Sequence, residues 1–161
     1  MRAAVITLSD SGYAGGREDK SGPAVRAMAE EAGFQVVWTA LLPDDRAGLA
    51  RELRRLCDGD LADLILTTGG TGFSPKDVTP EATMDVVERP VPGIPEAMRW
   101  YSLQHTPRAM LSRAAAGIRG RTLIVNLPGS PKAARECLEA ILPALPHGLE
   151  ILRGTTGECA Q

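Results

Sequence analysis

Leu64-Ile65-Leu66-Thr67 is a short apolar run, and Thr68-Gly69-Gly70-Thr71-Gly72 follows it without a break. A run of this length that ends at glycines is typical of a buried β-strand. Further along, Thr79-Pro80-Glu81 combines an N-cap residue, a proline at the first helical position and an acidic first turn, which together mark the start of a helix. These residues therefore predict a strand, a glycine loop and a helix in succession.

The same alternation continues in both directions along the chain. Further strands are expected at residues 5–8, 34–42 and 122–127, and further helices from 21, from 45, and over 96–104, 133–142 and 145–152. In the helix at 96–104, Ala97, Trp100 and Tyr101 are expected to form the buried face. Strands that alternate with helices imply βαβ units. We therefore predict an α/β fold, a three-layer α/β/α domain with a mostly parallel central sheet, as a single domain over 1–161 with a frayed tail at 155–161.

The composition is that of an ordinary globular protein. The 161 residues are 43% hydrophobic and 24% charged, close to the average for soluble domains. A net charge of −2 gives no electrostatic reason to expect nucleic acid or an anionic membrane. No apolar run approaches the roughly 20 residues that span a bilayer. Three scattered cysteines and two histidines do not make a zinc site and fit a reducing compartment, so we expect a cytoplasmic protein.

The glycine loop is the strongest candidate for a functional site. In an open α/β sheet, ligands bind at the carboxyl ends of the strands. Glycines there let backbone N–H groups approach an anion, and the hydroxyls of Thr68 and Thr71 can add donors. Asp77 is the one carboxylate of the loop. The loop matches neither the dinucleotide nor the P-loop pattern. A tight turn, with Asp77 capping a helix, is the alternative, but the density of glycines and threonines favours an anion site.

Two further loops at strand ends carry polar groups. Pro43-Asp44-Asp45 holds a carboxylate pair, which suits Mg²⁺, although an N-cap explains these two residues alone more simply. Asn126-Leu127-Pro128-Gly129-Ser130-Pro131 suits a phosphate or a nucleotide as well as it suits a rigid turn.

Two other segments offer weaker candidates. Ser9-Asp10-Ser11-Gly12 leaves a strand and could close over a ligand, though a solvated loop explains it more simply. Ser112-Arg113 offers an arginine for an anion, and a surface arginine is the alternative.

The motifs resemble those of the MogA and MoaB molybdenum-cofactor biosynthesis family, whose domain recurs in gephyrin. The resemblance rests first on Thr67-Thr68-Gly69-Gly70-Thr71-Gly72 with Asp77-Val78-Thr79-Pro80-Glu81-Ala82-Thr83. It extends over nearly the whole chain through segments in the family's order: 9–10, 19–23, 43–45, 92–99, 110–120 and 126–131. One departure is Lys76, where many relatives have arginine; a lysine keeps the charge and loses the bidentate fork.

The resemblance implies a reaction, the adenylylation of molybdopterin by Mg·ATP with release of pyrophosphate. The alternative is a MoaB-like protein that binds molybdopterin without adenylyl transfer. An interaction scaffold and an NAD enzyme fit the motifs less well. The implied cofactor is Mg²⁺, with ATP as co-substrate; the implied partners are a homotrimer and, downstream, the molybdate-insertion protein.

The resemblance also assigns residues. Asp44 would serve catalysis and hold the metal, and Asp77 would handle molybdopterin. The residues expected to bind substrate are Ser9, Asp10, Thr68, Gly69, Gly70, Thr71, Gly72, Ser112, Asn126, Pro128, Gly129 and Ser130.

Overall fold

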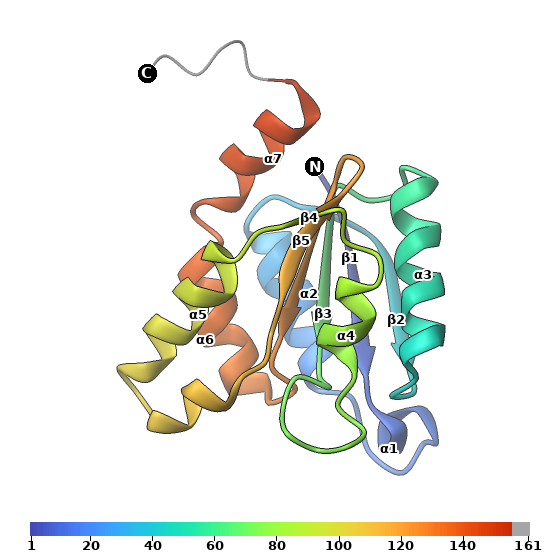
Figure 1. Cartoon of the computed structure of the whole chain (residues 1–161), viewed down its shortest axis with the longest axis vertical. Helices are drawn as coiled ribbons and strands as arrows, with labels where there is room; N and C mark the ends of the chain where they lie inside the picture. Colours follow the sequence, from blue (N-terminus) through green and yellow to red (C-terminus); the bar gives the residue numbers. More distant parts are fainter. Residues whose placement is uncertain (156–161) are drawn as a thin grey trace.

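The computed structural model describes residues 1–155, and these form one sheet of six strands with helices on both faces (Figure 1). The strands are β1 (Arg2–Leu8), β2 (Gln35–Leu42), β3 (Leu64–Thr68), β4 (Arg89–Pro90), β5 (Ala116–Arg119) and β6 (Thr122–Leu127). The helices are α1 (Asp10–Tyr13), α2 (Ser21–Glu31), α3 (Arg46–Asp58), α4 (Thr79–Met84), α5 (Gly93–Leu103), α6 (Pro131–Ile141) and α7 (Leu145–Arg153), with a 3-10 helix η1 (Pro107–Leu111). Most of the predicted frayed tail, 156–161, lies outside the described residues.

The sheet is mostly parallel, as predicted. Its strand order is β2-β1-β3-β6-β5-β4, and β2, β1, β3 and β6 run parallel to one another. The last two strands were not expected: β5 pairs antiparallel with β6, and β4 pairs antiparallel with β5. A turn at Gly120, with φ +55°, joins β5 to β6 as a hairpin.

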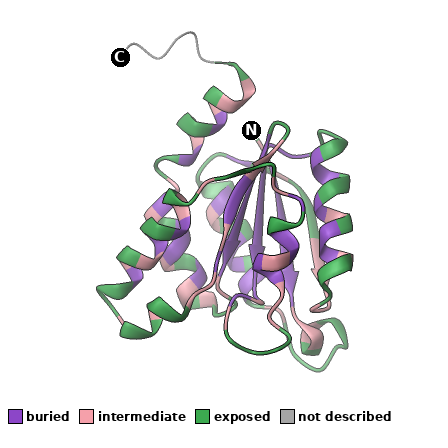
Figure 2. Cartoon of the chain, viewed as in Figure 1, coloured by how far each residue is buried: buried purple, intermediate pink, exposed green. Residues whose placement is uncertain are grey.

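Alternate residues of the strands supply two separate cores. Ala3 and Val5 of β1 face α2, α5, α6 and α7, whereas Ala4 and Ile6 face α3 and α4. Side chains of successive strand residues point to opposite faces, so a strand buried on both sides is apolar throughout. Figure 2 shows the central strands buried between helices whose outer faces are exposed, whereas the edge strands β2 and β4 are largely exposed or half-buried. The three-layer α/β/α prediction is confirmed.

The buried face of α5 differs from the prediction. Trp100 is 69% exposed, and the buried residues of this helix are Pro95, Met98 and Ser102. Ser102 lies against α6, where its Oγ is 3.5 Å from the Sγ of Cys137. The helix carries apolar residues on two sides, and the side with Met98 and Ser102 is the one that is buried.

The arrangement of the strands gathers the loops of interest at one edge. β1, β3 and β6 are adjacent and parallel, so their carboxyl ends lie together at the bottom of Figure 1, away from the N-terminus. The chain leaves these ends through Ser9-Asp10, through the glycine loop and through Pro128-Gly129-Ser130. Within residues 1–155, no helix is long and apolar enough to cross a membrane.

Candidate functional site

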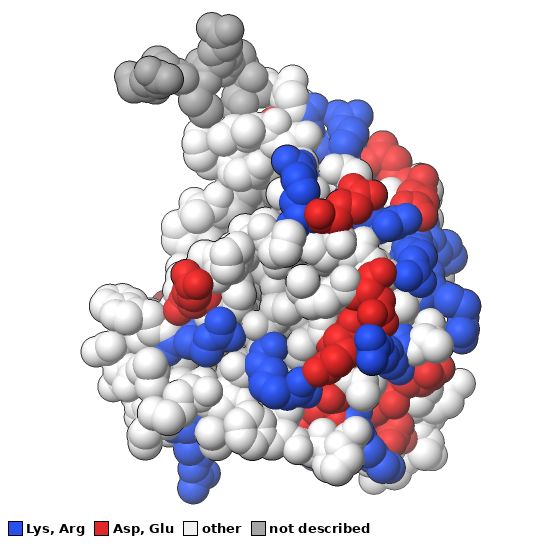
Figure 3. Space-filling model, in the orientation of Figure 1, with Lys and Arg blue, Asp and Glu red and all other residues white. Residues whose placement is uncertain are grey.

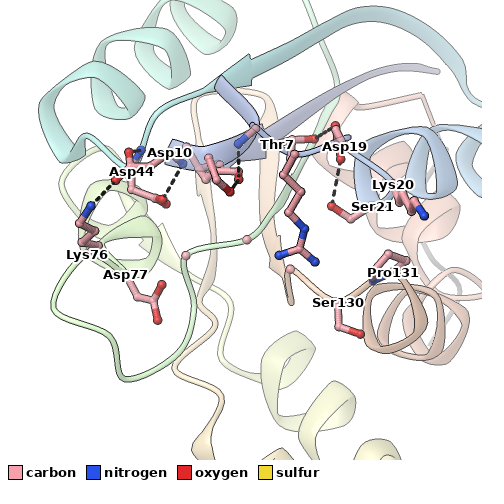
Figure 4. Close-up of a pocket in the computed structure, with 18 of the residues that line it drawn as sticks. Thr7, Asp10, Asp19, Lys20, Ser21, Asp44, Lys76, Asp77, Ser130 and Pro131 are labelled. Carbon is pink, nitrogen blue, oxygen red and sulfur yellow. Dashed lines mark hydrogen bonds and ion pairs between the residues drawn. The ribbon is translucent and has the colours of Figure 1, made fainter. Parts of the chain in front are cut away.

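A cavity of about 820 Å³ lies at the carboxyl ends of β1 and β3 (Figure 4). Its walls come from segments that are distant in the sequence: 7–12, 17–21, Asp44, the glycine loop with the residues that follow it, and the start of α6. The predicted site residues that line it are Ser9, Asp10, Asp44, Gly69, Gly70, Asp77, Gly129 and Ser130. Asp44 and Asp77, expected from the motifs to serve one site, thus face the same cavity.

The glycine loop has a backbone that only glycine adopts without strain. Gly69 and Gly70 have φ values of +101° and +67°. A Cβ on Gly69 would lie 2.3 Å from the carbonyl oxygen of Leu8, and a Cβ on Gly129 would lie 3.2 Å from the Cα of Gly69. The ends of β1, β3 and β6 therefore meet through bare backbone, with no room for a side chain.

Thr79 fastens the loop to α4. The sequence predicts Thr79 as the N-cap of this helix, but it is the first helical residue, and no side chain caps the helix at Val78. Its hydroxyl instead donates to the carbonyl oxygen of Gly69 at 2.8 Å. The proline and the acidic residue predicted for the first turn are both in place.

The carboxylate pair after β2 divides between two roles. Asp45 is the N-cap of α3, and its side chain accepts from the N–H groups of Ala47 and Gly48. Asp44 instead turns to the cavity. Its Oδ2 accepts from the N–H of Asp10 at 3.1 Å, and its own N–H donates to Oδ1 of Asp10 at 2.9 Å. These two reciprocal hydrogen bonds tie Asp44, just after β2, to Asp10, just after β1.

The carboxylates of the cavity have different electrostatic surroundings. Lys76 pairs with Asp10, with 2.9 Å between Nζ and Oδ2, and this hydrogen bond lowers the pKa of Asp10 (Figure 4). Burial raises the pKa of Asp44, and the negative charges of Asp10 and Asp77 add to the rise. A cation placed beside Asp44 would therefore favour its ionised form.

Some predicted residues lie outside this cavity. Thr68 is buried, and its hydroxyl donates to the carbonyl oxygen of Pro128 at 2.7 Å, which ties two of the loops together. A second, smaller cavity of about 260 Å³ includes Thr71, Gly72, Ser112 and Pro128 in its walls. The glycine loop thus contributes residues to both cavities.

Asn126 is fully buried in β6 and is surrounded by protein partners. Its amide nitrogen donates to the hydroxyls of Thr67 at 3.0 Å and Thr83 at 2.8 Å, and its Oδ1 accepts from the N–H of Ala115. Asn126 thus links β6 to β3 and α4 below the site.

We expect Asn126→Ala to destabilise the fold, because it leaves buried groups without partners. The free energy of unfolding should fall by about 1–3 kcal/mol. Urea denaturation measures this loss. A variant as stable as the wild type would contradict this role.

Sequence reasoning missed the function of Asp19. Its carboxylate accepts from the hydroxyl of Thr7 at 2.7 Å and from the N–H of Gly22 at 2.9 Å, and so holds the segment before α2 against β1. The position of an aspartate shortly before Ser21-Gly22-Pro23 is the signal that could have indicated a helix-start contact.

Comparisons with known proteins agree with the fold and the motifs. Residues 4–147 match the family model described as "Probable molybdopterin binding domain". A molybdopterin adenylyltransferase of Helicobacter pylori is 42% identical over 152 residues, covering 93% of this chain and 86% of that protein. The Escherichia coli protein of the same name is 37% identical over 175 residues, covering 99% and 89%.

A solved structure is similar over almost its whole length. The molybdopterin biosynthesis enzyme MoaB of Thermus thermophilus superimposes with a TM-score of 0.90 at 50% identity, covering 95% of this chain and 96% of that one. The resemblance expected from the glycine signature is confirmed. The chain belongs to the family of probable molybdopterin binding domains of molybdenum-cofactor biosynthesis.

Proposed function

We propose that this chain is a molybdopterin adenylyltransferase, which transfers AMP from ATP to the phosphate of molybdopterin and releases pyrophosphate. Relatives of that name at 37% and 42% identity over most of the chain support the proposal. The observation that carries it is the cavity in which Asp44 and Asp77 face the backbone of Gly69 and Gly70.

The reaction needs positioning and charge neutralisation more than a covalent group from the protein. An oxygen of the molybdopterin phosphate attacks the α-phosphorus of ATP. The new O–P bond forms as the bond to the leaving pyrophosphate breaks, and the pyrophosphate keeps the electron pair. The attacking phosphate is already ionised, so no general base is required. The N–H of Gly69 donates to the carbonyl oxygen of Leu127, so the N–H of Gly70 and the ammonium of Lys76 would face the phosphates.

Mg²⁺ fits this cavity as a partner of the substrate phosphates. Within the described part of the chain, no cluster of three or more His, Cys, Asp or Glu side chains could hold a metal by itself. Mg²⁺ is usually held by one or two carboxylates together with substrate phosphates. Asp44, whose pKa is raised by burial and neighbouring negative charge, is the residue that would hold it. When bound, the ion would neutralise charge between the carboxylates and the phosphates.

We place one substrate in each of the two cavities, which lie on either side of the glycine loop. The larger one is lined by the cationic side chains of Arg17, Lys20 and Lys76, which suit phosphates. The smaller one is mostly apolar and holds Arg99 and Ser112 at its wall, which suits a flat ring with polar edges. We place the reacting phosphates at the loop itself, between the two cavities.

The test is an incubation of the purified protein with molybdopterin, ATP and Mg²⁺. We expect release of pyrophosphate in equal amount to an adenylylated molybdopterin detected by mass spectrometry. Retention of molybdopterin without pyrophosphate would instead support the MoaB-like alternative, a binding protein without transfer.

We also propose the homotrimer that the resemblance implies. Trp100, Leu103, Met110 and Leu111 of α5 and η1 are exposed apolar side chains. On the face shown in Figure 3, charged residues gather over the side of α3 and α4, and the side of α5 carries few. Contiguous apolar surface marks protein contacts.

Light scattering should give three times the mass of the chain, and Trp100→Glu should lower this measured mass.

A further inference from the structure

The guanidinium of Arg113 binds both ends of segment 72–77 of the glycine loop. Its Nε donates to the carbonyl oxygen of Gly72 at 2.7 Å, and its Nη2 donates to the carbonyl oxygen of Asp77 at 2.7 Å. These two acceptors stand at the two ends of the segment 72–77. One planar group thus closes the segment into a loop.

Two further contacts strengthen this attachment. The backbone N–H of Arg113 donates to the carbonyl oxygen of Thr71 at 2.9 Å, and Nη1 forms an ion pair with Oε1 of Glu81 in α4. The other oxygen, Oε2 of Glu81, is buried and has no hydrogen-bond partner among residues 1–155. Arg113 is therefore the ion-pair partner that holds the partly exposed carboxylate of Glu81 against the loop.

The segment that carries Arg113 is itself held in place. Nη1 of Arg99, in α5, donates to the carbonyl oxygens of Ser112 and Ala114, the two neighbours of Arg113. The backbone on both sides of Arg113 is therefore attached to α5. The sequence suggested Ser112-Arg113 as a source of charge for an anion, but three donors of this arginine are spent on the loop and on Glu81.

The closed loop has consequences inside the larger cavity. Within this segment, Oδ2 of Asp77 accepts from the N–H of Ser74 at 3.0 Å, and Nζ of Lys76 donates to Oδ2 of Asp10. A Cβ on Gly72 would lie 2.9 Å from Oδ2 of Asp77, so the carboxylate packs directly over the loop backbone. Both side chains thus belong to the segment whose two ends Arg113 binds.

We infer that Arg113 is a positioning residue for adenylyl transfer: it fixes the glycine loop so that Asp77 and Lys76 face the reacting phosphates. The inference rests on the proposed function for its kinetic part only. A lysine at this position keeps the charge but cannot bridge acceptors that lie in a planar fork.

The experiment compares Arg113→Ala and Arg113→Lys with Arg119→Ala. Arg119 is a suitable control because its guanidinium also forms a two-point pair with a carboxylate, Asp58, and it lies outside both cavities. Pyrophosphate release is measured with and without millimolar guanidinium chloride, and amide hydrogen exchange is measured over 70–80.

Both Arg113 variants should lower kcat by about 10²-fold with a smaller change in KM for ATP, because misplacement of groups by about 1 Å costs that much. Their amides over 72–77 should exchange faster, and guanidinium should restore part of the kcat of Arg113→Ala. The Arg119→Ala variant should show neither effect. A role limited to stability would instead lower kcat in proportion to the folded fraction, with no rescue, and this would overturn the inference.

The exchange measurement keeps the two proposals separate. If the wild-type protein releases no pyrophosphate, the proposed function fails. Faster exchange in the Arg113 variants would still support the role of Arg113 in fixing the loop. Unchanged amide exchange over 72–77 in the Arg113 variants would overturn that role, whatever their activity. If Arg113→Ala does not fold, Arg113→Lys supplies the comparison of kcat and of amide exchange.

Discussion

Replacing Asp44 by asparagine should lower pyrophosphate release by about 10²–10³-fold, the loss typical of removing one group that stabilises developing charge. Asparagine has nearly the same shape and can still accept from the N–H of Asp10, so the fold should persist. It cannot share a cation with phosphates as a carboxylate does. Steady-state release of pyrophosphate at saturating ATP and Mg²⁺ measures the effect.

The same substitution should make the protein more stable at neutral pH. Because burial raises the pKa of Asp44, the ionised carboxylate is less favourable in the folded state than in the unfolded chain. The stability contributed by this group is fully present below its unfolded-state pKa and is lost as pH rises through its folded-state pKa. At pH 7 the wild type lacks this contribution to stability, whereas asparagine stays neutral at every pH. Thermal melting at pH 7 should therefore give a higher Tm for the inactive variant.

Asp45→Ala is the matched control for Asp44. It removes a carboxylate of the same pair but one that caps α3, so it should cost about 0.5–2 kcal/mol of stability and leave turnover nearly unchanged. Equal losses of activity in Asp44→Asn and Asp45→Ala would remove the distinction between the two aspartates. Full activity in Asp44→Asn would exclude Asp44 from the reaction.

Gly69→Ala should abolish turnover and destabilise the fold. Its φ of +101° is strained for any residue with a Cβ, and that Cβ would lie 2.3 Å from a backbone oxygen of β1, which cannot swing aside. The left-handed backbone alone costs about 1–2 kcal/mol, and the clash adds to it. Either Leu8 or the loop must move, and with it the amides of the site. Urea denaturation and pyrophosphate release measure the two losses.

Gly148→Ala provides the comparison. Gly148 lies in α7 with ordinary helical φ and nothing within 4 Å of an added Cβ. Alanine is the better helix former by up to about 1 kcal/mol, so this variant should be at least as stable as the wild type and fully active. A Gly69→Ala protein with wild-type stability and turnover would show that the strand ends do not meet as tightly as described.

The fold was predictable where one physical rule dominated. Runs such as 64–67 and 122–127 are apolar on both faces, and only a parallel sheet covered on both sides buries such strands. Strand β5 was missed because its four residues include Gly117, which has no side chain to show the alternation of a strand. The prediction of the buried face of α5 was wrong because it followed the aromatic residues Trp100 and Tyr101, whereas the helix packs against α6 through the side that carries Ser102.

The site was predictable in outline and not in detail. Glycines and carboxylates at strand ends indicated the cavity, since such ends share one edge of a parallel sheet. A residue type does not reveal whether its side chain points into the cavity or into the sheet, as Asn126 does. The contacts of Lys76 with Asp10, and of Arg113 with Gly72, join residues far apart in the chain, and no local spacing encodes them.

The strand order has a consequence for synthesis of the chain. β3 can pair with β1 as soon as both have left the ribosome, but its other edge must wait for β6, which lies more than fifty residues later. During that interval a nascent chain exposes an apolar strand edge that is open to pairing with other chains. A truncation that ends before Thr122 makes this state permanent, so such fragments should aggregate rather than accumulate as smaller folded units.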